Sequence, residues 1–308
     1  MTVTAFSDEG IGALLLWLKG EGYRFTAVTP ATHERVIARP RSGPASLRDV
    51  FGWSRDFRRD DPPAEAVRLM EAAGILEEEA GAFRSRLRIA SLGGDLFLHS
   101  AFPTDGEDSV FFGPDTYRFA RFIREAARGL APPARIVDMC AGSGAGGLFA
   151  ARLFPDAAVT LVDVNPLALR LARTNAAAAG VEVETIEAGR VPHEADLVLA
   201  NPPYMMDEGD RTYRDGGGLL GGAVALDWAL QALEALNRGG TLLLYTGAAV
   251  SDGSIPLAEA LESACAEAGA ECRIEEIDPD VFGEELDQPA YREVERIAAL
   301  GITIRKAD

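Results

Sequence analysis

The chain of 308 residues contains few cysteines and histidines, three of each. An odd number of cysteines without a C-x-x-C pair does not suggest a disulfide framework and suits a reducing compartment. The histidines are too far apart in the sequence to form a local zinc motif. We therefore expect a cytoplasmic protein without a bound metal.

Long apolar segments are also lacking. The longest apolar run, Ile11 to Leu18, is far shorter than a bilayer-spanning helix. Residues 1–10 begin with a polar, acidic stretch and lack the basic segment of a signal peptide. We expect no association with a membrane.

Positive charge is scarce, and its distribution is uneven. The chain has 30 Lys+Arg against 48 Asp+Glu, a net charge of −18. Residues 1–104 hold 13 basic and 14 acidic residues, whereas residues 105–308 hold 17 and 34. The acidic second part should repel a long polyanion, although a local basic patch could still bind one. The first part contains two arginine clusters, Arg55, Arg58, Arg59 and Arg84, Arg86, Arg88.

Residues 1–104 are predicted to form a small α+β domain that could recognise a substrate. Apolar spacing and capping residues indicate helices at Gly10 to Lys19, Ser46 to Trp53 and Pro63 to Leu76. An alternating strand, Phe83 to Ala90, then turns at Gly93-Gly94-Asp95 and returns as Leu96 to Ser100. Helices followed by a hairpin resemble a winged-helix module. Its alternating arginines are either one face of the wing or the solvated face of an amphipathic hairpin.

Residues 105–308 are predicted to form an α/β domain with a doubly wound, mostly parallel, seven-stranded Rossmann-like sheet. Predicted strands are Ala134–Cys140, Ala158–Val164, Val181–Ala188, Ala195–Asn201, Thr241–Thr246, Cys272–Ile277 and Glu293–Ile304 (broken near Gly301), and predicted helices are Gly146–Phe154, Pro166–Ala179, Leu219–Asn237 and Leu257–Ala268. Such a sheet binds ligands at the carboxyl ends of its strands. Because only a loop separates the last two strands, we expect the last strand to be antiparallel.

A glycine-rich turn follows the first of these strands. Gly142, Gly144 and Gly147 fit G-x-G-x-x-G, and Asp163 ends the next strand about 20 residues later. Glycines let the backbone approach a ligand closely, and the acidic residue can accept hydrogen bonds from two ribose hydroxyls. Both a nicotinamide dinucleotide and S-adenosylmethionine satisfy this pattern.

Asp138 favours the second of these cofactors. Its carboxylate lies ahead of the glycines, where it would repel a pyrophosphate and attract a sulfonium and an ammonium group. The run Asp138-Met-Cys-Ala-Gly-Ser-Gly144 resembles the first motif of class I methyltransferases, D-x-G-x-G-x-G, with Cys140 as a small motif residue and not a nucleophile. The residues predicted to bind S-adenosyl-L-methionine are Asp138, Cys140, Ala141, Gly142, Gly144, Asp163 and Asn201.

Asn201-Pro202-Pro203-Tyr204 follows the short apolar strand Ala195 to Ala200. A planar NH2 nitrogen is a poor nucleophile because its lone pair is delocalised, and two acceptors on its hydrogens can aim the lone pair at a methyl group. The Asn201 side-chain oxygen and the Pro202 carbonyl can supply these acceptors, and two prolines stiffen the backbone. Tyr204 can stack on the planar group. Asn201, Pro202 and Tyr204 are the predicted catalytic residues.

These motifs together resemble the HemK-like N-methyltransferases, which methylate the glutamine amide of translation release factors. The resemblance covers roughly residues 108–250. The segment Phe111-Phe-Gly-Pro-Asp-Thr-Tyr-Arg118 is similar to the family's Pro-Glu-Thr-Glu loop over cofactor and substrate, and Asp215-Gly-Gly217 to its Asp-Gly-Gly segment. The resemblance, with the motif above, implies substrate-binding roles for Phe112, Pro114, Thr116, Tyr117, Pro203 and Tyr204. Gly189-Arg190 stands where the family usually has an acidic residue that contacts adenine, and the first domain does not resemble that of the family.

The resulting prediction is an S-adenosylmethionine-dependent N-methyltransferase that acts on a protein glutamine amide, with a protein partner such as a translation factor. An exocyclic amine of adenine or guanine in RNA or DNA is the main alternative, supported by the arginine clusters. A small-molecule acceptor is a further one. Asp138 and the missing catalytic His or Lys/Tyr pair argue against a dinucleotide-dependent oxidoreductase, and the intact Asn201 motif argues against a non-catalytic binding module.

Overall fold

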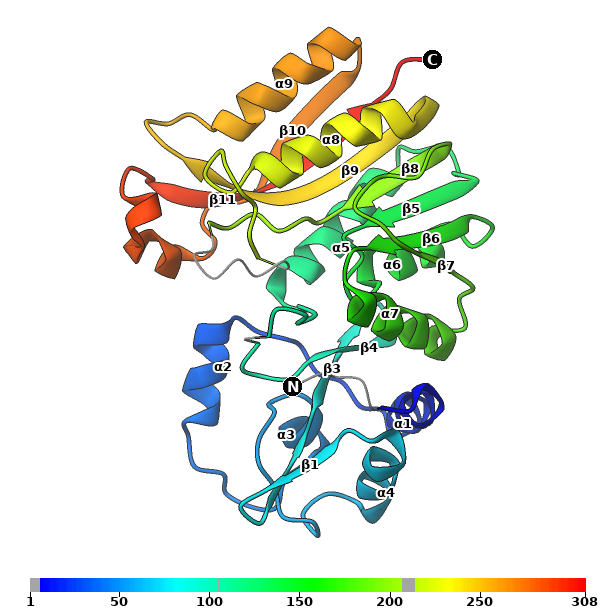
Figure 1. Ribbon diagram of the computed structural model, residues 1–308, viewed down its shortest axis with the longest axis vertical. Coiled ribbons are helices and arrows are strands. Elements are labelled where there is room, and N and C mark those ends of the chain that lie inside the picture. The colour runs from blue at the N-terminus through cyan, green and yellow to red at the C-terminus, as the bar shows by residue number, and fades with distance from the viewer. Residues whose placement is uncertain (1–5, 105, 207–213) are drawn as a thin grey trace. The chain divides into compact units, whose positions relative to one another are not determined.

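The computed structural model describes residues 6–104, 106–206 and 214–308 (Figure 1). Its internal contacts divide the chain into two compact units, neither of which is one continuous segment. The first unit comprises Met1–Tyr117, Gly142–Ala145 and Leu167–Glu182, and the second comprises Arg118–Ala141, Gly146–Pro166 and Val183–Asp308. The predicted functional division at residues 104/105 stays a prediction.

The second unit is built on a seven-stranded sheet in the order β10-β11-β9-β8-β5-β6-β7. The strands are β5 (Arg135–Met139), β6 (Ala158–Asp163), β7 (Glu184–Glu187), β8 (Ala195–Ala200), β9 (Leu236–Val250), β10 (Glu271–Asp278) and β11 (Arg296–Arg305). The pairs among β5 to β9 are parallel, and β11 is antiparallel to both β9 and β10. The predicted doubly wound sheet with an antiparallel last strand is therefore confirmed.

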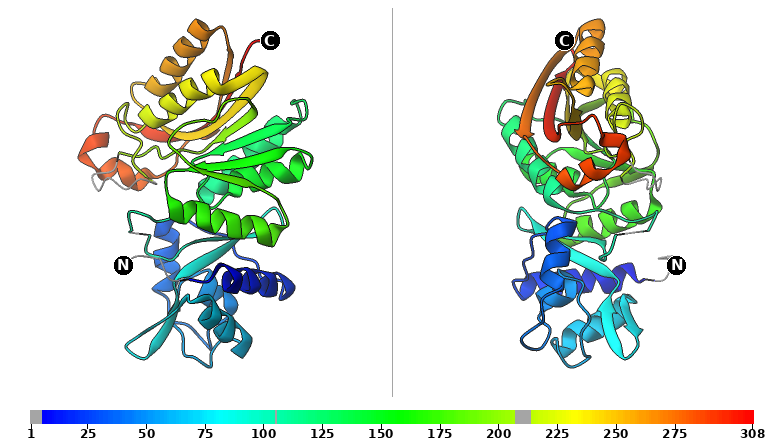
Figure 2. Two further views of the ribbon diagram at one scale, coloured as in Figure 1. Left: turned by 45° about the vertical axis from the view of Figure 1, so that its right-hand side comes forward. Right: turned by 90° about the vertical axis from the view of Figure 1, so that its left-hand side faces the viewer.

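Helices cover both faces of this sheet. They are α5 (Pro114–Ala127), α6 (Ala145–Leu153), α8 (Ala223–Ala235) and α9 (Pro256–Ala268). Side chains alternate between faces along a strand, so Leu244 of β9 packs in the cluster with α8 and α9, whereas Tyr245 meets Phe119 of α5, with ring centroids 6.1 Å apart. Figure 2 accordingly shows α8 and α9 on one side of the sheet and α5 on the other.

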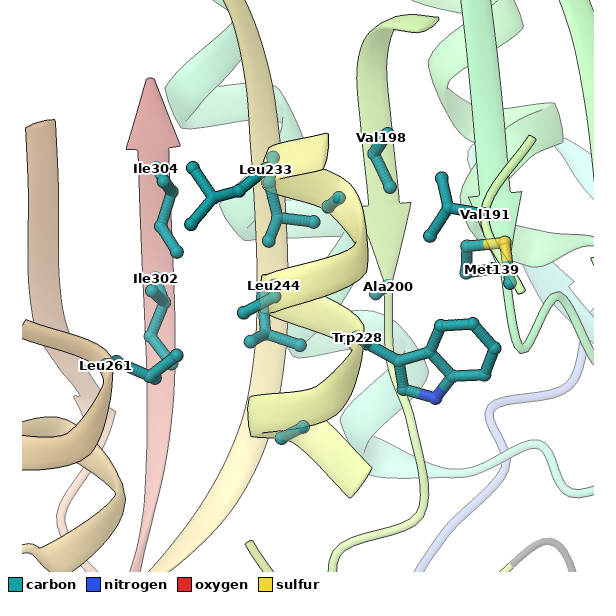
Figure 3. Packing of buried hydrophobic residues seen from close by; sticks show 14 of the residues in the cluster. Met139, Val191, Val198, Ala200, Trp228, Leu233, Leu244, Leu261, Ile302 and Ile304 are labelled. Atoms are coloured by element: carbon teal, nitrogen blue, oxygen red, sulfur yellow. The ribbon is translucent and has the colours of Figure 1, made fainter. Parts of the chain in front are cut away.

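The core on the α8 side supports the strand ends that carry the candidate site. Ala200 and Met139, the last residues of β8 and β5, are each 1% exposed and belong to this cluster. Figure 3 shows the Trp228 indole of α8 extending past Ala200 toward Met139. Burying such side chains contributes about 25 cal/mol per Å² of apolar surface, so the packing of α8 helps to fix the positions of both strand ends.

Several boundaries differ from the prediction. Helix α8 begins at Ala223, four residues after the predicted start, because Gly216 to Gly222 form turns. Strand β11 continues through Gly301, where a Cβ atom would lie 2.8 Å from ring carbons of Phe122 and 2.8 Å from Ile277. The glycine thus permits close packing against α5 and does not interrupt the strand.

The first unit contains helices and two separate hairpins. Its elements are α1 (Asp8–Gly20), α2 (Pro30–Ile37), α3 (Leu47–Phe51), α4 (Ala64–Ala73), β1 (Leu76–Glu79), β2 (Ala82–Ser85), β3 (Leu87–Leu92), β4 (Asp95–Ser100) and most of α7 (Pro166–Ala179). The predicted serine cap is present at Ser46, directly before α3. The predicted turn at Gly93-Gly94 connects β3 and β4. Its core includes Ala168 and Leu171 of α7, each 2% exposed or less.

One expectation for this unit is wrong, and one helix was not predicted. The segment Phe83 to Ala90 is not one strand: β2 pairs with the unpredicted β1, and β3 pairs with β4. The helix α2 was also not predicted. The winged-helix likeness stays a prediction.

The arginines of the two clusters serve largely structural contacts, which is the physical reason that they form no single solvated face. Arg55 donates to the carbonyls of residues 36, 37 and 39, at the end of α2. Arg88 is 4% exposed and donates to the Ser100 carbonyl at 3.0 Å. Arg59 and Arg84 pair with carboxylates, the latter with Asp56 at 2.7 Å.

Within the described residues, no helix combines the length and the apolar character that crossing a membrane requires.

Candidate functional site

The candidate site begins where β5 and β8 end side by side. Met139 is paired with Ala200 on one side and with Val162 on the other. Cys140 and Asn201 therefore follow β5 and β8, and Asp163 ends β6, at one edge of the sheet. The chain runs from β5 to β6 in one direction and from β8 to β9 in the other, so this edge is the switch point at which open α/β sheets bind ligands.

The turn after β5 has left-handed backbone conformation at alternate positions. Cys140 has φ 54°, Gly142 φ 53° and Gly144 φ 79°. The motif that this run resembles carries glycine at all three positions, which is what left-handed φ values favour. Cys140 adopts the same conformation in spite of its Cβ. Burial and the nearby Asp163 and Asp138 carboxylates raise the pKa of its thiol well above the usual value, so this cysteine is neutral and not a nucleophile.

Asp138 lies under this turn and is 2% exposed. Its carboxylate accepts a hydrogen bond from the Gly147 N–H at 2.7 Å. Burial raises the pKa of Asp138 to about 7, the Gly147 N–H opposes the rise, and the Asp163 charge adds to it. A buried carboxyl poised near neutral pH becomes fully ionised when a cation is placed beside it.

Gly146 and Gly147 allow α6 to start against this carboxyl. A Cβ atom on Gly146 would lie 2.9 Å from an Asp138 oxygen, and one on Gly147 would lie 2.5 Å from a methyl of Leu161. Larger residues would displace Asp138 or the helix. This close approach, with the left-handed turn before it, fits the compact binding of a cationic ligand on Asp138.

Asp163 ends β6 and accepts a hydrogen bond from the Asn165 N–H at 2.9 Å. The next residue, Val164, is 48% exposed, an unusual exposure for a valine. A Cβ on Gly189, just after β7, would lie 3.4 Å from Val164. The carboxylate and the apolar side chain suit the ribose and the base of a nucleoside, respectively. Arg190 is exposed here, where the resembling family has an acidic residue.

Asn201 and Pro202 extend beyond β8 with their acceptors available. Asn201 is half-buried and Pro202 is buried. Among the residues that the structure describes, none hydrogen-bonds to the Asn201 side chain or to the Pro202 carbonyl. A polar amide at a half-buried strand end normally has a partner. The pair of free acceptors therefore suits a ligand that donates two hydrogen bonds.

Tyr204 is 8% exposed and is packed within the second unit. Its ring lies over β9, where a Cβ on Gly247 would be 2.4 Å from two ring carbons. It also meets Phe282 edge-on, with ring centroids 6.0 Å apart. Gly247 and Phe282 were not predicted as site residues, and the sequence signal for them was a glycine within an apolar strand.

The Asp215-Gly216-Gly217 segment packs against the backbone of the same motif. A Cβ on Gly216 would lie 2.6 Å from the Tyr204 Cα, and one on Gly221 would lie 2.2 Å from the Tyr204 carbonyl oxygen. Gly216 N–H also donates to the Met205 carbonyl at 2.8 Å. These glycines are required for contact with the residues that follow Asn201. Part of the acidic stretch from 205 to 214, namely 207–213, lies outside the described residues.

The residues predicted to bind substrate before the sheet belong to the first unit. Pro114, Asp115 and Thr116 form the first turn of α5 and not a loop, because Thr116 Oγ1 accepts from the Gly113 N–H at 3.3 Å and caps the helix. Tyr117 Oη accepts from the Ala27 N–H at 2.9 Å. Phe112 is 1% exposed, so its ring is used in packing.

Comparison with known proteins finds one matching family model, several curated relatives and several similar solved structures. Residues 127–265 match the Methyltransferase small domain family. The release factor glutamine methyltransferase of Deinococcus radiodurans is 34% identical over 145 residues, which are 42% of this chain and 51% of that protein. The ribosomal RNA small subunit methyltransferase C of Pseudomonas entomophila is 36% identical over 76 residues, 24% of this chain and 23% of that protein. The crystal structure of Trm5b from Pyrococcus abyssi superposes with a TM-score of 0.50 at 16% identity, over 76% of this chain and 62% of that one.

These similarities cover the α/β sheet and part of each relative. The chain spans about half the length of the release factor glutamine methyltransferase that it matches. Residues 127–265 match a methyltransferase domain, the seven-stranded sheet is Rossmann-like, and S-adenosylmethionine is the cofactor. Asp138, the left-handed turn and Asp163 fit that cofactor, since they place carboxylates for its cationic and ribose parts.

Proposed function

We propose that the protein is an S-adenosylmethionine-dependent N-methyltransferase whose acceptor is a planar NH2 group, the side-chain amide of a protein glutamine. The observation that carries the proposal is the pair of free acceptors at Asn201 and Pro202, one strand away from Asp138 and Cys140. The similarity to a release factor glutamine methyltransferase supports the choice of an amide.

In this proposal, Asp138 holds the cationic part of the cofactor and Asp163 the ribose hydroxyls. When bound, S-adenosylmethionine supplies a methyl group on a positively charged sulfur. The Asn201 side-chain oxygen and the Pro202 carbonyl each accept a hydrogen bond from the acceptor NH2, which localises the nitrogen lone pair and orients it. The rate enhancement then comes from positioning and electrostatics and requires no general base.

Tyr204 and Pro203 form the wall that contacts the flat acceptor group. Tyr204 is held by Gly247 and Phe282, so only a small part of its ring is available for that contact. Pro114 and Thr116, at the start of α5, and Phe112 and Tyr117 beside them remain proposed substrate contacts. Their packing in the first unit favours a supporting role for Phe112 and Tyr117.

An exocyclic amine of a nucleic acid base is the second candidate, because the chain is also similar to a ribosomal RNA methyltransferase. Two of the arginines that favoured this acceptor in the sequence are used in internal contacts, namely Arg55 at the end of α2 and the buried Arg88. The net charge of −18 also opposes binding of a long polyanion. These observations support the protein amide as the proposed acceptor.

The test is transfer of radiolabelled methyl groups from S-adenosylmethionine into cell lysate, followed by protease or nuclease digestion. We expect protease-sensitive label, and we expect Asn201→Ala to lower turnover about 100-fold or more while sparing cofactor affinity. Asn237→Ala is the matched control, because the Asn237 amide binds Asp196 at the opposite end of the strands. Nuclease-sensitive label would overturn the amide assignment, and full activity of Asn201→Ala would overturn the mechanism.

A further inference from the structure

The connection between β10 and β11 contacts the Asn201 motif from a distant part of the sequence. This β10–β11 segment, Val281–Tyr291, contains the two short 3₁₀ helices Gly283–Asp287 and Pro289–Tyr291. It is anchored to the sheet, since the Val281 N–H donates to the Ile297 carbonyl of β11 at 2.8 Å. The connection between the two strands is longer than a typical hairpin loop, and its conformation brings three residues against the Asn201 motif and the residues that follow it.

The first contact is aromatic. Phe282 meets the Tyr204 ring at 6.0 Å between centroids with an interplanar angle of 64°, the edge-to-face arrangement that aromatic pairs favour. Phe282 has φ 55°, which is unfavourable for a residue with a Cβ. The surrounding structure must therefore hold this residue in place, and Phe282 in turn limits the movement of the Tyr204 ring.

The second contact is a hydrogen bond to the residues that follow Tyr204. The Met206 N–H donates to Tyr291 Oη at 2.7 Å, and the Tyr291 hydroxyl lies 3.9 Å from the Met205 sulfur. Tyr291 is 1% exposed. A buried backbone N–H without a partner is costly, so Tyr291 fixes the course of the chain directly after the motif.

The third contact is made by Glu285 with Arg214. Glu285, 6% exposed, forms an ion pair with Arg214 and accepts a hydrogen bond from Gln288. The Arg214 carbonyl accepts from the Met205 N–H at 3.0 Å. Three residues of one segment thus contact Tyr204, Met206 and Arg214, all of which lie in or after the Asn201 motif in the sequence.

We infer that the β10–β11 segment positions the acceptor-binding residues through Phe282, Glu285 and Tyr291, and that it controls acceptor turnover without affecting cofactor affinity. The inference rests on the proposed function, because it assumes that Tyr204 faces the acceptor. Phe282 and Tyr291 are positioning residues, since they act through Tyr204 and Met206. Differences in this segment between relatives would then alter which acceptor is accepted.

The experiment compares Tyr291→Phe with Tyr23→Phe in the full chain. Each substitution removes one buried tyrosine hydroxyl, and the Tyr23 hydroxyl donates to the Ile89 carbonyl at 2.9 Å in the first unit. The lysate fraction that accepts labelled methyl groups serves as the substrate, and its turnover is measured per S-adenosylmethionine-binding site. The Kd of the cofactor is measured by calorimetry. Counting binding sites removes the effect of any unfolded fraction.

We expect Tyr291→Phe to lower kcat/KM for the acceptor about tenfold with cofactor Kd unchanged within twofold, and Tyr23→Phe to change neither. Glu285→Gln should lower kcat/KM for the acceptor as Tyr291→Phe does, and Glu284→Gln, at an exposed position, should leave it unchanged. This second pair of variants tests the inference if Tyr291→Phe is unstable. Equal activity of Tyr291→Phe and Tyr23→Phe, or weaker cofactor binding in Tyr291→Phe, would overturn the inference while leaving the proposed function intact. Absence of Asn201-dependent transfer by the unmodified protein would overturn both.

Discussion

Replacing Asp138 by asparagine should stabilise the protein at neutral and alkaline pH and weaken its cofactor binding. The pKa of Asp138 is raised from 3.8 to about 7 because the carboxyl is buried. Since one pKa unit corresponds to 1.36 kcal/mol, this rise represents about 4 kcal/mol. A raised folded-state pKa means that the contribution of this carboxyl to stability is complete below pH 4 and is lost as the pH rises through 7.

Asparagine keeps an oxygen that can accept from the Gly147 N–H and carries no charge. The free energy of unfolding of Asp138→Asn, from urea titrations, should therefore match that of the unmodified protein near pH 4 and exceed it by about 4 kcal/mol at pH 8. Cofactor affinity of the unmodified protein should increase from pH 6 to pH 8 as Asp138 ionises, and the asparagine variant should lack this component. Stability curves that run parallel from pH 4 to pH 8 would refute the reasoning, because they would mean that burial of the charge has no cost.

Two more substitutions probe the packing around the site. Gly247→Ala should displace the Tyr204 ring, since the new Cβ would lie 2.4 Å from two ring carbons. We expect the free energy of unfolding to fall by about 1–3 kcal/mol and acceptor turnover to decrease. Gly12→Ala, whose new Cβ would meet no atom within 4 Å, is the control in the denaturation and activity assays. Asn175→Asp should raise the cofactor Kd and lower the melting temperature, because the amide donates to the Ser143 carbonyl at 2.9 Å and accepts from the Leu98 N–H at 2.9 Å; an unchanged Kd would show that the turn after β5 does not depend on this bond.

Much of the second unit could be predicted because its signals are local. Helix α7 begins at Pro166 and ends at Ala179 as predicted, since proline at the first position and a glycine at position 180 mark its ends. The apolar strands were found by their continuous hydrophobic runs. Antiparallel pairing of β10 and β11 was predicted because no crossover helix was expected between them.

The first unit was predicted less well because its pairing depends on tertiary contacts. Strand β1 contains three consecutive glutamates and forms only by pairing with β2. Helix α2 has one buried residue, His33, and thus weak apolar periodicity; its Thr29 cap and Pro30 were the available signals. Arg88 is buried although arginine is rarely buried.

The site shows the same division. Asp138 and Asn201 could be predicted as site residues because each stands in a short motif at the end of a strand, where neighbouring residues define the chemistry. Gly247, Phe282 and Tyr291 lie more than 40 residues after Tyr204 and carry no motif of their own. Their relation to the site arises only when β9, β10 and β11 assemble.

The first unit is built from separate segments of the chain, and this limits which segments can be exchanged with those of related proteins. Helix α7 contributes Ala168 and Leu171 to the core of the first unit, and Arg170 forms an ion pair with Asp8 at 2.7 Å. A fusion joined at residue 104 would separate Ala168 and Leu171 from the rest of the core that they share with the front segment. Exchange of the front segment during evolution or by protein engineering therefore has to include α7, and substitutions in α7 should be accompanied by compensating substitutions in α1 and β4 across related sequences.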